Sequence, residues 1–263
     1  MTQHRPLDPQ LFPTEISSFL GSISQLAFPP QGDTSAVAVV DTARGKYVVK
    51  RSCGEQFGSW IRQEYTVLAT LIQSPFPTPY PHVFIQREAT SELESWLVMS
   101  YLPGDPLIIA IEKESDQEER LSILRAFGNI LATIHRHRTL SELRSDRTLS
   151  QAEYNFLHYQ TEGSAELLEH LKQHQPHLFP PTLIHGDFTV DNVLISEGKV
   201  TGIIDWAGGG KGDSRYDLAL AIRPKKTGLF QARQDRQAFF EGYGLSELSQ
   251  PDYHYFVGLY EFF

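Results

Sequence analysis

The sequence predicts an α+β fold in which strands dominate the first third of the chain and helices dominate the remainder. Four segments of the first third are apolar, rich in β-branched residues and bounded by turn-forming residues, a pattern typical of strands. They are residues 35–41, 46–50, 83–86 and 96–101. Beyond residue 106 apolar residues recur at helical spacing, most clearly over 121–137. This change of pattern predicts a β-rich part, a connector over 100–106 and a mainly helical part.

Local signals predict the remaining elements. Residues 42–45 predict a hairpin turn between the first two strands. Apolar residues at helical spacing predict a helix over 57–73, which the proline-rich run 75–81 is expected to end. The charged segment 139–175 is poor in strand-forming residues and is expected to be helical, as is most of the chain beyond residue 205. Three short apolar segments predict further strands: residues 182–185, 192–195 and 200–205.

Composition limits the partners and the location of the protein. The 263 residues carry a formal net charge of −9, and a negative protein repels nucleic-acid phosphates, so we expect no nucleic-acid partner. No run of about 18 or more apolar residues is present, and residues 1–10 lack the basic start and apolar core of a secretory signal. The single cysteine, Cys53, excludes an intrachain disulfide. These features predict a cytoplasmic protein with no membrane partner.

The strongest chemical signal is the segment 185–192, His-Gly-Asp-Phe-Thr-Val-Asp-Asn, between two predicted strands. It contains Asp187 and Asn192, and Asp205 follows at the end of a later strand. Phosphoryl transfer requires a carboxylate that orients the attacking hydroxyl, and metal ions that clamp the phosphates. Asp187 can accept the hydroxyl proton, whereas Asn192 and Asp205 can supply hard oxygen ligands to Mg²⁺. The segment therefore predicts a phosphotransfer site with Asp187 as its catalytic residue.

This arrangement closely resembles the catalytic loop and metal-binding segment of kinase-fold phosphotransferases, and especially of the aminoglycoside phosphotransferase family. The family has the same His-Gly-Asp followed by Asn, and the segment 212–219 is similar as well. The resemblance extends from about residue 20 to the end of the chain, and the layout looks like the aminoglycoside 3′-phosphotransferase branch. It implies a protein-kinase-like bilobal fold, with a small antiparallel-sheet lobe that carries one helix and a larger, mainly helical lobe.

The same resemblance implies a division of labour along the chain. Residues 1–99 would form the nucleotide-binding lobe, 100–106 the hinge, and 107–263 the catalytic and acceptor-binding lobe. ATP and Mg²⁺ are the implied cofactors, and a hydroxyl of a small molecule is the implied acceptor of the γ-phosphate, in a monomer or dimer. The sequence lacks a glycine-triplet loop, His-Arg-Asp and Ala-Pro-Glu, which argues against a protein kinase. A non-catalytic nucleotide-binding scaffold is a further alternative, but it would have no need of Asp187.

A lysine in the β-rich part resembles the nucleotide-binding lysine of kinases. Lys50 ends the segment Tyr-Val-Val-Lys, similar to the Val-Ala-Ile-Lys strand whose lysine contacts the α- and β-phosphates. Such a lysine needs an anion to hold it, and Glu64 is the expected partner, with Glu55 as its rival. The phosphate-covering loop would be 32–35, with Ser35 contacting phosphate, although an ordinary hairpin turn is the alternative.

Residues 97–104 resemble the strand and connector between the kinase lobes. Backbone groups from Ser100 to Leu102 would bond the adenine edge, with Met99 packed beside it. His135 lies in a segment that also resembles a family helix, and we expect it to be a structural polar group and not a catalytic one.

The acceptor is the part of the resemblance that leaves alternatives open. By analogy with the 3′ branch, Glu261 and the carboxylate of Phe263 would line an aminoglycoside site, whereas a simply packed terminal helix is the alternative. The segment 206–211 lacks the arginine of that branch, and 224–228 has two lysines where the branch has a pair of acids. A cationic acceptor is disfavoured by such lysines. An aminoglycoside-type antibiotic is the first expectation, with a macrolide, choline, homoserine or a sugar as alternatives.

Overall fold

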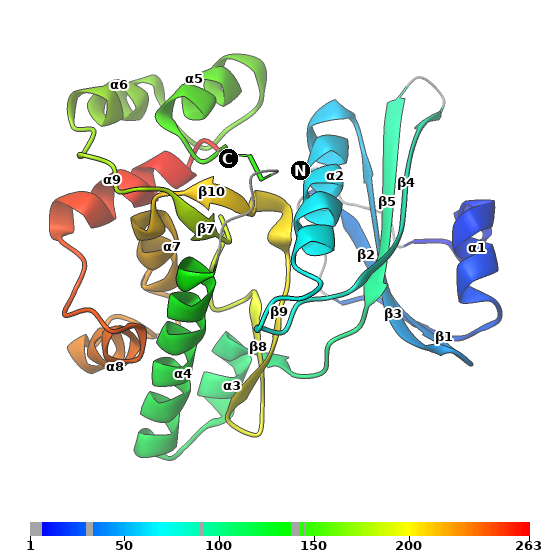
Figure 1. Ribbon diagram of the computed structural model, residues 1–263, viewed down its shortest axis with the longest axis horizontal. Coiled ribbons are helices and arrows are strands. Elements are labelled where there is room, and N and C mark those ends of the chain that lie inside the picture. Colours follow the sequence, from blue (N-terminus) through cyan, green and yellow to red (C-terminus); the bar gives the residue numbers. More distant parts are fainter. Residues whose placement is uncertain (1–6, 30–33, 90–91, 138–142, 145) are drawn as a thin grey trace. The chain divides into compact units, whose positions relative to one another are not determined.

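The computed structural model of the protein describes residues 7–29, 34–89, 92–137, 143–144 and 146–263, and it confirms the predicted α+β fold class (Figure 1). Contacts divide the chain into two compact units, Met1–Gln73 with Thr78–Leu102, and Ser74–Pro77 with Pro103–Phe263. The passage from Leu102 to Pro103 falls inside the predicted connector. None of the helices in the described ranges combines the length and the apolar character needed to cross a membrane.

The first unit is built on a five-stranded sheet with the order β1-β2-β3-β5-β4, in which all neighbours are antiparallel. Its strands are β1 (Ile23–Ala27), β2 (Ala36–Thr42), β3 (Gly45–Cys53), β4 (Pro81–Ala89) and β5 (Glu92–Ser100). Four of these were predicted, and the expected turn joins β2 to β3. The sequence analysis missed β1, because this edge strand is mostly exposed and lacks the alternation of apolar and polar residues that marks a half-buried strand.

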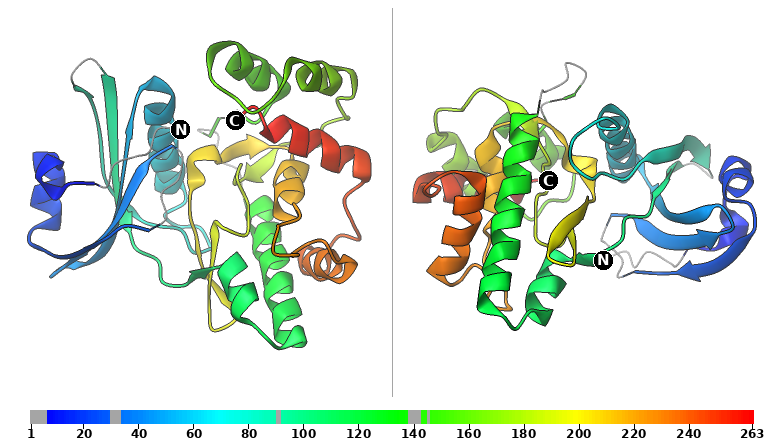
Figure 2. Two further views of the ribbon diagram at one scale, coloured as in Figure 1. Left: turned by 180° about the vertical axis from the view of Figure 1, so that it is seen from behind. Right: turned by 60° about the horizontal axis from the view of Figure 1, so that its bottom comes forward.

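Two α-helices cover opposite faces of this sheet, as both views in Figure 2 also show. The short α1 (Thr14–Leu20), preceded by the 3-10 helix η1 (Pro9–Leu11), buries its apolar side chains against Val49 and the rest of the sheet's core. Alternate residues of a strand face opposite sides, so Lys50 points to the other face, where α2 (Glu55–Thr70) lies. The expectation of a single helix in this part needs correction, because seven residues are too few for α1 to show a clear helical period.

The second unit contains seven α-helices within the described residues. They are α3 (Leu107–Lys113), α4 (Gln117–Arg136), α5 (Leu149–His158), α6 (Ala165–Gln173), α7 (Ser214–Ala221), α8 (Arg233–Tyr243) and α9 (Gln250–Tyr260). The long α4 packs closely on α8 because each helix has a glycine at the crossing. A Cβ atom on Gly128 would collide with a backbone carbonyl of α8, and one on Gly242 would collide with a backbone carbonyl of α4. The helix α4 also contacts β7 and β9, the strands that precede Asp187 and Asp205.

Short antiparallel strands complete the second unit. They are β6 (Asp105–Pro106), β8 (Val193–Ser196) and β9 (Lys199–Ile203) in one sheet, and β7 (Thr182–Ile184) with β10 (Gly210–Gly212) in another; the 3-10 helix η2 (Trp206–Gly208) precedes β10. The predicted strands at 182–185, 192–195 and 200–205 are present as β7, β8 and β9. The sequence analysis missed β6 and β10, because two or three proline- or glycine-containing residues become strands only through pairing with a distant partner.

One short segment joins a different unit from the one expected. The predicted division places all of residues 1–99 together, whereas Ser74–Pro77 pack with the second unit. The ring of Phe76 stacks on Trp206, with 5.9 Å between ring centroids, and the carbonyl of Pro77 accepts a hydrogen bond of 2.9 Å from the N–H of Ile203. These contacts come from residues more than a hundred positions away, so local sequence could not reveal them.

Candidate active site

The segment between β7 and β8 is the predicted catalytic loop, and a buried carboxylate of α7 holds its first residues. The carboxylate of Asp217 accepts the N–H of His185 at 2.6 Å and the N–H of Gly186 at 2.8 Å. It also lies 3.2 Å from Nε2 of His135, which agrees with the structural role expected for that histidine. Gly186 has φ +77°, and a Cβ atom there would collide with the carbonyl of Gly208. Glycine is therefore required where the loop touches the segment that follows Asp205.

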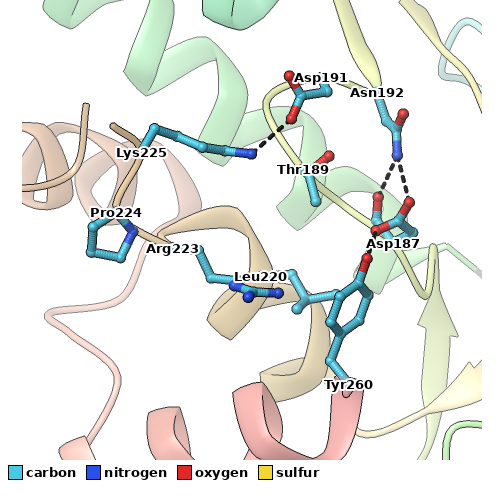
Figure 3. Close-up of a pocket in the computed structure, with 9 residues that line it drawn as sticks. All are labelled: Asp187, Thr189, Asp191, Asn192, Leu220, Arg223, Pro224, Lys225 and Tyr260. Carbon is cyan, nitrogen blue, oxygen red and sulfur yellow. Dashed lines mark hydrogen bonds and ion pairs between the residues drawn. The ribbon is translucent and has the colours of Figure 1, made fainter. Parts of the chain in front are cut away.

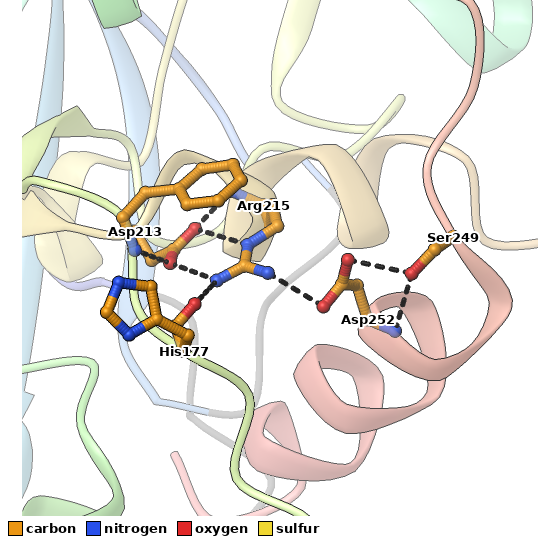
Figure 4. Close-up of polar contacts among 6 residues, drawn as sticks. His177, Asp213, Arg215, Ser249 and Asp252 are labelled. Carbon is orange, nitrogen blue, oxygen red and sulfur yellow. Dashed lines mark hydrogen bonds and ion pairs between the residues drawn. The ribbon is translucent and has the colours of Figure 1, made fainter.

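A second buried cluster fixes α7, the helix that carries Asp217 (Figure 4). Asp213 precedes the helix and accepts the N–H of Arg215 at 3.0 Å, as helix-capping residues do. The Arg215 guanidinium then bonds Asp213 again, the carbonyl of His177 at 2.7 Å and the carboxylate of Asp252 in α9 at 2.7 Å. The segment 212–219, which is similar to the family, therefore contains residues that hold the predicted catalytic loop in place.

Asp187 is held from two sides. The amide of Asn192 donates to the Asp187 carbonyl and to its Oδ2 atom, both at 2.9 Å (Figure 3). The hydroxyl of Tyr260, at the end of α9, donates to Oδ1 at 3.1 Å. The sequence analysis did not single out Tyr260, since it lies 73 positions away and the aromatic residues near the end of the chain carried no spacing signal.

The surroundings of Asp187 tune its acidity. Burial raises the pKa of Asp187 to about 7, and the nearby carboxylate of Asp205 also raises it. Hydrogen bonds from Tyr260 and Asn192, and the positive charge of Arg147, act in the opposite direction on the same pKa. A carboxylate that titrates near the working pH is well suited to accept a proton in a reaction.

The two residues predicted to bind metal both act on Asp187, Asn192 through a hydrogen bond and Asp205 through its charge. Asn192 uses its amide nitrogen on Asp187, so its carbonyl oxygen faces away and is available as a ligand. Asp205 lies two residues after β9, immediately before η2, with φ +65°, a conformation that costs a non-glycine residue about 1–2 kcal/mol and is often found at functional sites. The described residues contain no cluster of three or more His, Cys, Asp or Glu side chains suited to a metal. One amide and one carboxylate fit Mg²⁺, which takes few protein ligands and retains water or phosphate oxygens.

A cation that the sequence analysis did not single out lies against the catalytic loop. Arg147, in the segment before α5, donates through Nε to the carbonyl of Gly186 at 3.3 Å, and its guanidinium lies 4.4 Å from the ring centroid of Phe263. A Cβ atom on Gly208 would lie 2.6 Å from Nη2 of Arg147, so glycine leaves room for the guanidinium. The segment 206–211, which lacks the arginine of the 3′ branch, thus has an arginine beside it from another part of the chain.

In the first unit the predicted lysine–glutamate pair is present. Nζ of Lys50 in β3 lies 2.8 and 2.9 Å from the two carboxylate oxygens of Glu64 in α2. The side chains are 12% and 2% exposed, respectively, so water does little to weaken the pair. The rival Glu55 is an exposed residue in the first turn of α2. The contact is therefore with Glu64, as expected, while its role in binding nucleotide stays a prediction.

The remaining predicted nucleotide contacts lie along β2 and β5. Gly32 and Asp33 of the expected phosphate loop lie outside the described residues, and Ser35 is half-buried immediately before β2. Met99 is buried in β5, paired with β3 and β4. The N–H of Ser100 is bonded to the carbonyl of Tyr80, whereas no described residue accepts the N–H of Leu102.

A pocket of about 410 Å³ opens beside Asp187 in the second unit (Figure 3). Residues of the predicted catalytic loop, of the end of α7 and the segment after it, and of the end of α9 line it, and most of them are polar or charged. They are Asp187, Thr189, Asp191, Asn192, Leu220, Arg223, Pro224, Lys225 and Tyr260. Both the candidate general base and one candidate metal ligand face this pocket, so it is the candidate site for the acceptor.

The last residues, 261–263, pack against other parts of the second unit. Glu261 accepts a hydrogen bond of 3.2 Å from Arg223, and the ring of Phe263 supports the guanidinium of Arg147. Asn155 donates to the carbonyl of Phe262 at 2.9 Å, which fixes the terminus against α5. Neither Glu261 nor Phe263 is among the described residues that line the pocket. Their predicted contact with an acceptor stays a prediction.

Fold and site together define a class of protein. An antiparallel sheet with a lysine–glutamate pair, together with a helical unit that carries an Asp, an Asn and a second Asp on neighbouring loops, is the arrangement of a kinase-like phosphotransferase. A family model described as the phosphotransferase enzyme family matches residues 26–255. The chain belongs to this family, and it is a phosphotransferase with an alcohol group as acceptor.

Individual relatives differ in the acceptor that their names state. The aminoglycoside 3′-phosphotransferase of Streptomyces fradiae is 27% identical over 206 residues, 70% of this chain and 74% of the relative. The homoserine kinase of Neisseria meningitidis serogroup B is 35% identical over 94 residues, 34% of this chain and 30% of the relative. Among solved structures, a thermostable mutant of an aminoglycoside phosphotransferase with ADP and hygromycin B matches with a TM-score of 0.67 and 18% identity, over 94% of this chain and 87% of that one. That structural likeness confirms the kinase-like fold.

Proposed function

We propose that the protein transfers the γ-phosphate of ATP, with Mg²⁺, to a hydroxyl group of a small molecule bound in the pocket beside Asp187. The observation that carries this proposal is the geometry of Asp187. Its carboxylate is fixed by hydrogen bonds from Asn192 and Tyr260 and faces the pocket, and the charge of Asp205 raises its pKa. A binding protein without catalysis would not need a carboxylate that titrates near pH 7 at this place.

In the proposed reaction a bond forms between the acceptor oxygen and the γ-phosphorus, while the bond from that phosphorus to the β–γ bridging oxygen breaks. ADP leaves with the electron pair of the broken bond, and the acceptor proton passes to the Asp187 carboxylate. Asn192 and Asp205 would hold Mg²⁺, which neutralises charge on the phosphate oxygens when bound. Asn192 would therefore serve twice, because its amide nitrogen orients Asp187 and its carbonyl oxygen is available for the metal.

Contacts in the first unit support the nucleotide half of this proposal. Lys50, fixed by Glu64, would contact the α- and β-phosphates. The N–H of Leu102, which has no acceptor among the described residues, can donate to the adenine edge. Ser100 would contribute backbone groups, and Met99 would pack beside the base. A cytoplasmic location and a monomeric or dimeric state stay predictions from the sequence.

The acceptor is proposed at two levels. A small hydroxyl compound follows from the family and the pocket. An aminoglycoside-type antibiotic is the finer expectation, supported by the relative from Streptomyces fradiae, and resistance to such an antibiotic would then be the biological role. A macrolide, choline, homoserine or a sugar is the alternative at this finer level.

The test is release of ADP by the purified protein with Mg-ATP, with and without each acceptor of a panel. We expect acceptor-dependent turnover, and Asp187→Asn should lower it by about 10²- to 10⁴-fold, the usual contribution of a general base. Glu241→Gln is the control, since this exposed carboxylate pairs with Arg125 and is not among the described residues that line the pocket. Mg-ATP binding by both variants should be retained. Near-normal turnover of Asp187→Asn would refute the assignment.

A further inference from the structure

The pocket beside Asp187 has a basic wall. Arg223 and Lys225 follow α7 directly and line the pocket on either side of Pro224, as Figure 3 shows. Lys226, the next residue, is exposed and is not among the described residues that line it. The two cations therefore belong to the acceptor site, while their neighbour does not.

The acidic residues near this wall are already engaged by it. Asp191 pairs with Lys225 at 2.7 Å, and Glu261 pairs with Arg223 at 3.2 Å. Among the described residues that line the pocket, Asp187 is the one carboxylate without a basic partner at ion-pair distance, and the reaction uses it. A polycationic acceptor needs several carboxylates to replace its lost hydration, and this pocket does not offer them.

The basic residues, in contrast, retain donors for a ligand. A guanidinium has five N–H groups, and of those on Arg223 only Nη2 has an acceptor within the described structure. An ammonium has three N–H groups, and Lys225 uses one of them on Asp191. The planar guanidinium suits a carboxylate or phosphate, which it can bind through two parallel hydrogen bonds.

The position of Arg223 also sets the distance from the reacting hydroxyl. Its guanidinium lies 5.1 Å from the ring centroid of Tyr260, and the hydroxyl of the same ring donates to Asp187. The cation and the general base are thus separated by one aromatic ring. A volume of about 410 Å³ lies near the lower end of the range of about 300–1,000 Å³ that is typical of small-molecule sites. A compact acceptor can reach both groups.

We propose that the acceptor is a small hydroxyl compound that carries an anionic group, a carboxylate or a phosphate, which binds Arg223 and Lys225 while its hydroxyl lies at Asp187. This inference rests on the proposed phosphotransfer and replaces the aminoglycoside expectation. An incoming anion would share the N–H groups of Arg223 with Glu261. At Lys225, whose positive charge Asp191 balances, the anion would add a second negative charge.

Matched pairs of acceptors test the anionic group directly. ADP release with Mg-ATP is measured for glycerate against glycerol, gluconate against sorbitol, and glucose 6-phosphate against glucose, with kanamycin and choline as cationic acceptors. We expect kcat/KM to be at least about tenfold higher for the anionic member of one pair, as the loss of a charge-assisted hydrogen bond predicts. Comparison of the two carboxylate pairs with the phosphate pair shows whether the anionic group is a carboxylate or a phosphate.

Variants test whether Arg223 binds that anionic group. Arg223→Gln should raise KM for the preferred anionic acceptor by about tenfold or more with a smaller change in kcat, and Arg223→Lys should restore part of the loss. Lys226→Gln, the matched control outside the pocket, should leave KM unchanged. Equal effects of Arg223→Gln and Lys226→Gln would overturn the assignment, and thermal melts of both variants check that they are folded.

The outcomes separate this inference from the proposed function. Turnover confined to kanamycin, choline or the neutral acceptors would overturn the anionic acceptor and leave the phosphotransfer intact. Silence with every anionic acceptor, while Mg-ATP still binds, also counts against the anionic class. Absence of Mg-ATP binding by the wild-type protein would overturn the proposed function itself.

Discussion

Asparagine in place of Asp187 should stabilise the metal-free protein at alkaline pH while it removes activity. In an unfolded chain the pKa of an aspartic acid is about 3.9, whereas burial raises the pKa of folded Asp187 to about 7. Between these values the unfolded chain releases the proton and the folded protein keeps it. Stability therefore falls as the pH rises from about 4 to about 7, and the full penalty is present above pH 7. The substituted asparagine would not titrate and would escape this penalty.

The size of the effect follows from two opposing contributions. The two pKa values differ by about 3, and each unit corresponds to about 1.4 kcal/mol, so the ionised carboxylate costs about 4 kcal/mol. An asparagine cannot accept hydrogen bonds from both Asn192 and Tyr260 as the carboxylate does, and the loss of one such bond costs about 1–1.5 kcal/mol. The net gain of the variant should be about 2–3 kcal/mol above pH 8.

Thermal and urea unfolding in the presence of EDTA measure this gain. At pH 8.5 the variant should melt about 4–12 °C higher than the wild type, given a change of about 2–4 °C per kcal/mol for a chain of this size. At pH 4.5 little of the penalty has developed, so the variant should be equal to the wild type or slightly less stable. The quantity that tests the prediction is the difference between the variant's gain in stability at pH 8.5 and its gain at pH 4.5.

Two results would refute the reasoning. A gain of the same size at pH 4.5 and pH 8.5 would show that it does not come from ionisation of Asp187, and no gain at pH 8.5 would show that the carboxylate is not destabilised by burial. Asp191→Asn is the control, because this exposed side chain forms an ion pair with Lys225. We expect that variant to show no gain that grows with pH.

Three further substitutions test the supporting structure. Glu64→Gln removes the carboxylate that pairs with Lys50, so it should lower the free energy of unfolding by about 2–3 kcal/mol in urea and weaken Mg-ATP binding about tenfold by calorimetry. Unchanged nucleotide affinity would contradict the role of this pair. Asp217→Asn turns an amide group towards backbone N–H donors of the catalytic loop, and thermal melts should show a loss of about 2–4 kcal/mol together with reduced turnover. Gly186→Ala should lower the free energy of unfolding by more than about 3 kcal/mol, because its Cβ would collide with a backbone carbonyl. Gly198 has a similar positive φ but open surroundings, so Gly198→Ala should cost only about 1–2 kcal/mol. Similar losses for both variants would show that crowding is not the cause.

Local sequence was sufficient for the residues that share one loop or one strand. Asp187 and Asn192 lie five positions apart, and the loop between two short strands brings them into contact. Lys50 was found because it ends a recognisable strand, and Glu64 because it lies in the helix that follows. In such cases the spacing along the chain limits the spacing in space, so a motif predicts a contact.

Tertiary packing decided the contacts between distant residues. Tyr260 reaches Asp187 across 73 positions, because α9 packs beside the catalytic loop. Arg147 comes to rest against Gly208 from another part of the chain, although nothing in its own neighbourhood predicts a partner. Segment 74–77 joined the second unit for the same reason. Hydrophobic periodicity gives the faces of helices but not which helix meets which loop.

The sequence by itself determined the α+β class, the contact between Asp187 and Asn192, and the chemistry of phosphotransfer, because these depend on patterns within about twenty residues. The character of the acceptor pocket was decided only by the tertiary structure. The sequence places Arg223 and Lys225 after a helix, whereas the folded chain brings both to the pocket beside Asp187 and pairs them with Glu261 and Asp191, respectively. Charge in a pocket depends on which side chains face it and which neighbours neutralise them, and both are properties of the folded chain.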